Sequence, residues 1–221
     1  MTFWERYRPE ELLLFSEQVY WRLFDLHNQA WWPAPIIALL LGGGLILATV
    51  RPTPARLRVC LGGLATLWVF VGFAYLNARY ATINWAARYA VPLFVVEAVL
   101  LVAAALFPGT GRVRDHRRAW PGLVGPGLIV YAVILHPLTA LSRETGLSGA
   151  EVFGLTPDPL AIATLGTLSL SGNRLPAMAL SAAPTIWLLV SATTLFALDS
   201  ILAWVPLCAV VLAWAALLNP R

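Results

Sequence analysis

Long apolar runs follow one another along this chain, and they constrain its fold more than any other feature. An α-helix needs about 20 mainly apolar residues to cross the hydrocarbon core of a bilayer, which is about 30 Å thick. Charged residues make up only 12% of the chain, against about 25% in an ordinary soluble domain. The sequence therefore predicts an all-α, polytopic transmembrane helix bundle of about seven spans. The expected spans are residues 35–50, 57–76, 88–107, 124–141, 160–171, 177–198 and 201–218.

The fifth run is too short to cross a bilayer alone. Residues 160–171 form a helix of about 18 Å at the usual rise per residue. Such a helix is either buried among longer ones, or begins below the membrane surface and places a carboxylate at the bottom of a depression. Pro157 or Pro159 suits its first turn, and Thr156 or Asp158 is expected to cap its free N–H groups. The alternative for Asp158 is a role restricted to the cap and the helix dipole.

A helix of a different kind precedes these runs. Between residues 9 and 30, apolar side chains recur at helical spacing, and charged side chains occupy most of the remaining positions. Such a helix lies in the membrane interface. Trp31, Trp32 and Pro33 then mark the headgroup level and the turn into the bilayer. We therefore expect an amphipathic interfacial helix with a tryptophan belt at residues 1–33 and a seven-span transmembrane domain at residues 34–221. The expected apolar stripe consists of Leu12, Phe15, Val19, Leu23 and Leu26.

The charged residues predict the orientation. Every basic residue is an arginine, so the chain has no lysine for a Schiff base, which excludes a retinal photoreceptor. The arginines are spread over short connections, which argues against a nucleic-acid partner. Connections on one side of the predicted membrane carry nine arginines and one acid, whereas those on the other carry six arginines and nine acids. The positive-inside rule then places the amino terminus outside and the carboxyl terminus in the cytoplasm. Glycines within the first two runs, 42–44 and 62–63, are expected to let helices approach closely.

Polar side chains near the apolar runs gather toward the predicted outer side. Glu97 lies about 13 Å into the third run, near the bilayer midplane. A charged group is costly there by a few kcal/mol, so Glu97 should be protonated, paired with an arginine, or in contact with water. His136 precedes Pro137, which frees a backbone carbonyl one turn back. An outward-facing polar pocket is the functional hypothesis. Its candidate ligand-binding residues are Asp158, Glu97, His136, Asp199, Arg79, Arg88, His27, Asn28, Asn84 and Thr156.

Each of these residues also has a purely structural interpretation. Arg79 or Arg88 can form an ion pair with one of the two aspartates. Glu97 can donate a hydrogen bond to a neighbouring helix while neutral, and His136 can bond to a backbone carbonyl.

Catalytic and metal-binding motifs give little support to an enzyme. The chain contains no Gly-x-Ser-x-Gly, His-Glu-x-x-His, P-loop or Gly-x-Gly-x-x-Gly pattern. His27, His116 and His136 belong to different segments, and His116 lies on the opposite side. We therefore expect neither a metal site nor a cofactor.

Four patches of sequence, in this order, resemble an uncharacterised family of bacterial multi-pass membrane proteins, a domain of unknown function. They are residues 15–18 with 24–34, residues 81–87, residues 153–159, and residues 184–187 with Asp199. The resemblance implies this topology and a bacterial inner membrane, but no activity. The family pattern has a cysteine between the two prolines where this chain has Asp158, and a histidine upstream where residues 146–149 have none. A thiol or metal role is therefore not implied here.

Two functions remain open at this stage. In the first, an inner-membrane protein binds or passes a small solute or ion through the outward-facing pocket. In the second, it is a non-catalytic partner subunit or sensor, which docks a protein partner through residues 1–30. The lipid bilayer is a partner in both.

Overall fold

The computed structural model describes residues 15–107, 113, 121–143 and 145–219. Within them the regular structure is helical, apart from isolated bridges at Val113 and Ser171 and at Phe153 and Thr156. The α-helices are α1 (Glu17–Ala30), α2 (Ala34–Val50), α3 (Pro54–Phe70), α4 (Val91–Leu106), α5 (Pro121–Val130), α6 (His136–Leu138), α7 (Pro157–Ser169), α8 (Arg174–Leu180), α9 (Ala182–Ala197) and α10 (Trp204–Leu218). Shorter 3-10 or π segments are η3 (Val71–Asn77), η4 (Tyr80–Thr82), η5 (Trp85–Ala90), η6 (Tyr131–Leu135), η7 (Thr139–Ser142), η8 (Gly146–Gly149) and η9 (Ile201–Ala203).

Five helical stretches of the described chain are long and apolar enough to cross a membrane. They are Pro54–Thr82, Trp85–Leu106, Gly122–Ser142, Arg174–Ala197 and Ile201–Leu218. A sixth results if α1 and α2, which meet at a bend of 92°, are counted as one broken span. The expected all-α membrane bundle is thus confirmed, whereas the expected number of seven spans is not. Of the two other predicted runs, one forms α2, with 17 residues, and one forms α7, with 13 residues.

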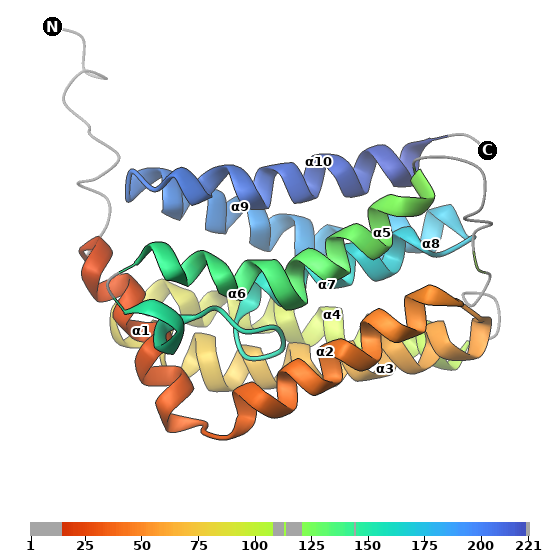
Figure 1. Cartoon of the computed structure of the whole chain (residues 1–221). Helices are drawn as coiled ribbons and strands as arrows, with labels where there is room; N and C mark the ends of the chain where they lie inside the picture. Colours follow the sequence, from red (N-terminus) through yellow and green to blue (C-terminus); the bar gives the residue numbers. More distant parts are fainter. Residues whose placement is uncertain (1–14, 108–112, 114–120, 144, 220–221) are drawn as a thin grey trace, which may run out of the picture.

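Helix α7 lies at the centre of the bundle (Figure 1). All 13 of its residues are buried, and α3, α5, α9 and α10 pack against it. The indole Nε1 of Trp68 in α3 donates a hydrogen bond of 2.9 Å to Thr164 Oγ1 of α7. A helix enclosed by other helices can be shorter than the bilayer, because lipid does not contact its ends. Of the two expected arrangements, the structure therefore has the one in which the short helix is buried among longer ones.

Helix α1 lies across one end of the bundle, which we call the α1 end (Figure 1). Its buried face carries Tyr20, Trp21, Leu23, Phe24, His27 and Asn28. Val19 and Leu26 of the expected apolar stripe are instead 41% and 36% exposed. The end of the bundle offers backbone carbonyl groups to which Asn28 donates hydrogen bonds. The face of α1 that is buried is therefore rotated relative to its most apolar face. The predicted part of this helix before residue 15 lies outside the described residues.

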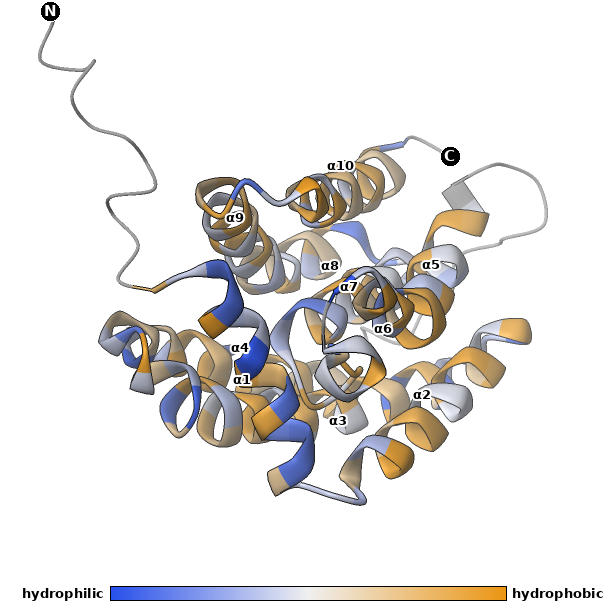
Figure 2. Cartoon of the chain, turned by 60° about the vertical axis from the view of Figure 1, so that its left-hand side comes forward, coloured by the Kyte–Doolittle hydropathy of each residue, from blue (hydrophilic) through white to orange (hydrophobic). Residues whose placement is uncertain are grey.

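The surface is consistent with a membrane location. Figure 2 shows hydrophilic residues on α1, whereas α2 and α10 are largely hydrophobic. Exposed tryptophan and tyrosine side chains of the described residues gather toward the α1 end, as in the interfacial belt of membrane proteins. They are Trp31, Trp32, Trp85, Tyr89 and Trp204. The opposite end, which we call the arginine end, carries Arg51, Arg56 and Arg58 around the connection from α2 to α3.

Most glycines of the first two runs do not bring helices together. A Cβ added at Gly42 would lie 2.6 Å from Val133 Cγ1, so this residue does permit a close contact. A Cβ added at Gly43, Gly44, Gly62 or Gly63 would meet no atom within 4 Å. The expectation of close approach is therefore wrong for these four glycines, because no atom of another helix comes within contact distance of them.

Candidate functional site

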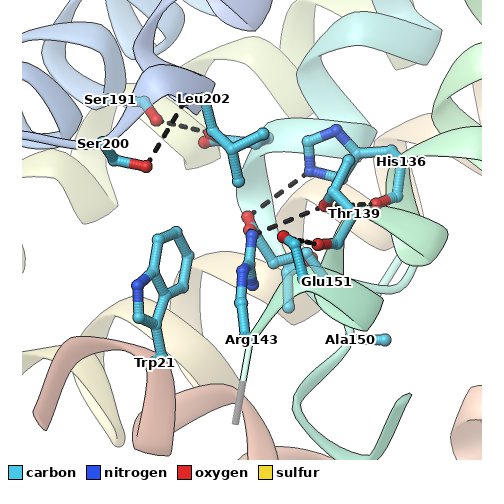
Figure 3. A network of polar contacts seen from close by, with 12 residues as sticks. Trp21, His136, Thr139, Arg143, Ala150, Glu151, Ser191, Ser200 and Leu202 are labelled. Atoms are coloured by element: carbon cyan, nitrogen blue, oxygen red, sulfur yellow. Dashed lines mark hydrogen bonds and ion pairs between the residues drawn. The ribbon is translucent and has the colours of Figure 1, made fainter. Parts of the chain in front are cut away.

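A buried ion-pair network lies beneath the α1 end, and Glu151 is its centre (Figure 3). Arg143 Nη2 lies 2.8 Å from Glu151 Oε1, and His136 Nε2 lies 3.5 Å from Glu151 Oε2. Thr139 Oγ1 lies 3.5 Å from Arg143 Nη2 and donates to the carbonyl of His136 at 2.7 Å. The side chains of Glu151 and Arg143 are 5% and 6% exposed. A carboxylate removed from water to this extent requires the opposite charge beside it.

Local sequence places these groups. Pro137 has no N–H to donate to the preceding turn, and the helix adopts the π form over η6 immediately before His136. Asn28 of α1 donates from its amide nitrogen to the carbonyls of Ser148 and Ala150, at 2.9 and 2.8 Å. These bonds tie the segment before Glu151 to α1. The predicted candidate Asn28 therefore positions the network.

An open cavity of about 860 Å³, which we call the α1 cavity, lies next to this network. Its polar lining comes from α1, from the chain around η7 and from the turn before η9, and includes Glu17, Arg22, Asp25, Arg143, Thr145 and Asp199. Arg143 therefore contacts both the cavity and the network. Of the ten predicted pocket residues, Asp199 is the one that lines this cavity. It has a positive φ of 53°, a conformation that aspartate adopts more readily than most residues.

Arg143 has unused hydrogen-bonding capacity. Its guanidinium carbon lies 3.4 Å from the ring centre of Trp21, in a cation–π contact. Its Nη2 bonds to Glu151. Its Nε and Nη1 are buried and have no hydrogen-bond partner among the described residues, and the same holds for Thr145 Oγ1. A buried polar group without a partner costs about 1–3 kcal/mol, so a hydrogen-bonding partner would stabilise these three atoms.

Asp158 is buried next to the network rather than in the cavity, with 3% exposure. Its Oδ1 accepts a hydrogen bond of 2.8 Å from Trp187 Nε1, and its Oδ2 accepts one from the hydroxyl of Ser191. The expected helix cap is absent: Thr156 holds the N-cap position of α7 without a side-chain cap bond. The hydroxyl of Thr156 instead donates to the carbonyl of Val152. Asp158 therefore joins α7 to α9.

Glu97 is fully buried on the inner face of α4. Neither carboxyl oxygen has a hydrogen-bond partner within the described residues, and no ion pair to Glu97 is formed there. Glu97 is therefore closed to the solvent around the bundle and pairs with no arginine among the described residues. A charged carboxylate in these surroundings would cost several kcal/mol, so the protonated form fits them best.

The other predicted residues are dispersed around the α1 end. His27 is buried, with its ring 5.2 Å from that of Tyr75 between centres. Asn84 caps η5 by accepting from the N–H of Ala86. Arg79 is half-buried and Arg88 is exposed. Neither forms an ion pair with an aspartate in the part of the chain that the structure describes, where the ion pairs are those of Glu151.

Sequence reasoning missed Arg143 and Glu151 as site residues. Both occur in a connection between apolar runs, where charged residues are usually solvated, and they are eight positions apart. The one signal in the sequence is that the connection carries an arginine and an acid beside His136. Only the folding of η7 and η8 under α1 brings these side chains together.

The ion-pair network around Glu151 predicts how the stability of the fold depends on pH. Burial alone would raise the pKa of Glu151, but Arg143 and His136 outweigh it and lower this pKa from 4.5 to about 2. The unfolded chain then binds more protons than the folded chain between these values, so stability is full above pH 4.5 and is lost as pH falls toward 2. We expect a loss of up to about 3 kcal/mol from this residue, seen as a falling melting temperature in detergent. The Glu151→Gln variant should lose less over the same range; parallel curves would contradict the assignment.

Comparison with known proteins identifies the chain at the level of a family only. A search of the curated proteins and of the solved structures found no significant match. A family model does match residues 17–221, which include every helix described above. The matched family is described as a family of unknown function, and the expected resemblance to an uncharacterised family is thereby confirmed. The chain belongs to the family of unknown function DUF6064.

Proposed function

We propose that this integral membrane protein binds a small zwitterionic solute, with a carboxylate and an ammonium group, in the α1 cavity. The observation that carries the proposal is Arg143, whose side chain is only 6% exposed and lines the cavity with Nε and Nη1 unpartnered among the described residues. Nε and Nη1 lie on different edges of the guanidinium, so a ligand carboxylate can accept a hydrogen bond from one of them at a time. The unpartnered hydroxyl of Thr145 is a further group for a ligand on the same lining.

The charges around the cavity favour a zwitterion over a simple anion. Glu151 already neutralises Arg143 from the protein side. Glu17, Asp25 and Asp199 also line the cavity, with Arg22 as the other basic group among the described lining residues. These acids would repel a further carboxylate on the ligand, whereas they would attract an ammonium group on the ligand. Asp199 suits this role, because it is exposed on the cavity lining and forms no ion pair within the described chain.

The proposal includes a location and an orientation. We place the protein in a bacterial inner membrane, with the α1 end outside, because the arginine-rich connections lie at the opposite end. The α1 cavity would then be open to solutes from outside the cell. Helix α7 and the buried network lie beneath the cavity, which supports binding more directly than passage.

Ligand-dependent thermal unfolding in detergent tests the proposal. Millimolar α-amino acids should raise the melting temperature of the wild-type protein, whereas acetate or methylammonium alone should raise it less. Arg143→Lys keeps a positive charge beside Glu151 but lacks the two free guanidinium N–H groups, so it should fold and lose the ligand effect. Asp199→Asn should lose about tenfold in affinity through the weaker contact with the ammonium group.

Arg88→Gln is the matched control, because this arginine is exposed and does not line the cavity. It should respond to amino acids as the wild type does. The proposal fails if no amino acid stabilises the wild type, or if folded Arg143→Lys and Asp199→Asn respond as strongly as Arg88→Gln.

A partner-docking function is the second candidate, and Val19 and Leu26 are the observation that favours it. Both are exposed on α1, and Val19 also lines the α1 cavity. In that case, a charged substitution of Leu26, which does not line the α1 cavity, would release a co-purifying protein and leave amino-acid binding unaffected.

A further inference from the structure

The surface between α2 and α3 is hollowed by a groove of about 660 Å³, which we call the α2–α3 groove. Its lining is almost entirely apolar and includes Gly44 of α2 and Cys60, Gly63 and Leu67 of α3. A Cβ added at Gly44 or Gly63 would meet no atom within 4 Å. The groove is therefore open because these positions lack side chains and no other helix of the described chain fills the space.

The length of the groove matches one leaflet of a bilayer. Along α3 it extends from Ala55 to Leu67, which is about 18 Å at the helical rise. Half of the hydrocarbon core measures about 15 Å. An extended acyl chain of one leaflet can therefore lie along the groove from end to end. The neighbouring side chain of Val59 is 75% exposed, so the groove opens toward the surrounding lipid.

The charge at the end of the groove selects among lipids. Arg56 lines the groove where α3 begins, at the arginine end, and its Nη1 donates to the carbonyl of Arg51. Arg51 and Arg56 are both exposed, and residues 51–67 include no acid. Two arginines at the headgroup level attract a negatively charged headgroup, each by about fivefold in affinity.

We infer that the α2–α3 groove binds one anionic phospholipid, with an acyl chain between the two helices and the headgroup against Arg51 and Arg56. This site is separate from the α1 cavity and lies in the opposite leaflet. It also accounts for the open glycines, which would otherwise leave an unfilled notch in the lipid-facing surface.

Native mass spectrometry of the full chain, released from micelles containing phosphatidylglycerol or phosphatidylcholine with identical acyl chains, tests the inference. The wild type should retain one phosphatidylglycerol in preference to phosphatidylcholine. Replacing both Arg51 and Arg56 by glutamine should reduce this preference by about twenty-five-fold. Gly63→Leu should abolish retention of the lipid, because the leucine side chain occupies the groove.

Gly62→Leu is the control for Gly63→Leu. It is the neighbouring residue, also open to its surroundings, but it does not line the groove. Melting temperatures of both variants should remain near that of the wild type and establish that both fold. Equal lipid retention by Gly62→Leu and Gly63→Leu would overturn the inference, as would equal retention of both lipids by the wild type. A dimer in detergent that only Gly63→Leu dissociates would assign the groove to a second copy and also overturn it.

Discussion

Replacing Arg143 by methionine is expected to lower the free energy of unfolding by about 3–5 kcal/mol, because it leaves the buried Glu151 with only the more distant His136 beside it. Methionine retains much of the length of the arginine and can still cover Trp21, so the loss reports mainly the charge. The two side chains are 6% and 5% exposed. At this burial an ion pair is weakly screened by water, and removing one member costs far more than removing a surface pair. Reversible unfolding in mixed micelles with increasing sodium dodecyl sulfate measures the effect.

A double-mutant cycle separates the charge from the packing. The variant that combines Arg143→Met with Glu151→Leu removes both charges, and it should recover most of the stability that Arg143→Met loses. Arg22→Met is the control, because Arg22 lines the same cavity but is exposed and forms no ion pair in the described chain. It should change stability by less than about 1 kcal/mol. If Arg143→Met lowers the free energy of unfolding no more than Arg22→Met does, the ion pair between Arg143 and Glu151 does not stabilise the fold.

The sequence predicts the bundle because each apolar run carries its own signal. A span needs about 20 residues, so residues 160–171 are too few to cross the bilayer as the longer runs do. Two arrangements were expected for this short run, and α7 has the one in which the helix is buried among longer ones. The rotation of α1 was not predictable in this way. Hydrophobicity alone favours burying Val19 and Leu26, whereas the bundle end offers polar carbonyls that Asn28 can bind.

The candidate site was less predictable, since it depends on side chains that meet only after folding. Depth in the membrane singles out Glu97, His136 and Asp158, and all three are buried in the fold and do not line the α1 cavity. It gives no information on partners, which come from other helices: Trp187 and Ser191 for Asp158, and Glu151 for His136. Arg143 appears in the sequence as an ordinary charge on a connection. Its role depends on the fold of η7 and η8 beneath α1.

The crossing of α5 and α7 should tolerate no side chain at Gly125. A Cβ added there would lie 2.7 Å from the carbonyl oxygen of Gly166 and 2.7 Å from Leu170 Cδ2. The contact is reciprocal, because a Cβ at Gly166 would lie 2.8 Å from the carbonyl oxygen of Gly125. A backbone oxygen cannot move aside as a side chain can, so the helices must separate. We expect Gly125→Ala to lower the free energy of unfolding by about 1–3 kcal/mol, measured in the same mixed micelles.

Gly127 provides a matched control two residues away on the same helix, where an added Cβ would meet no atom within 4 Å. Gly127→Ala should leave stability unchanged or raise it by up to about 1 kcal/mol, because alanine has the higher helix propensity. The two alanine variants should therefore differ by about 1–4 kcal/mol although the substitution is the same. Since α7 is enclosed on all its faces and α5 leads into His136 through η6, separation of these helices should also disturb the ion-pair network. Equal stability of the two variants would show that α5 and α7 are not in backbone contact.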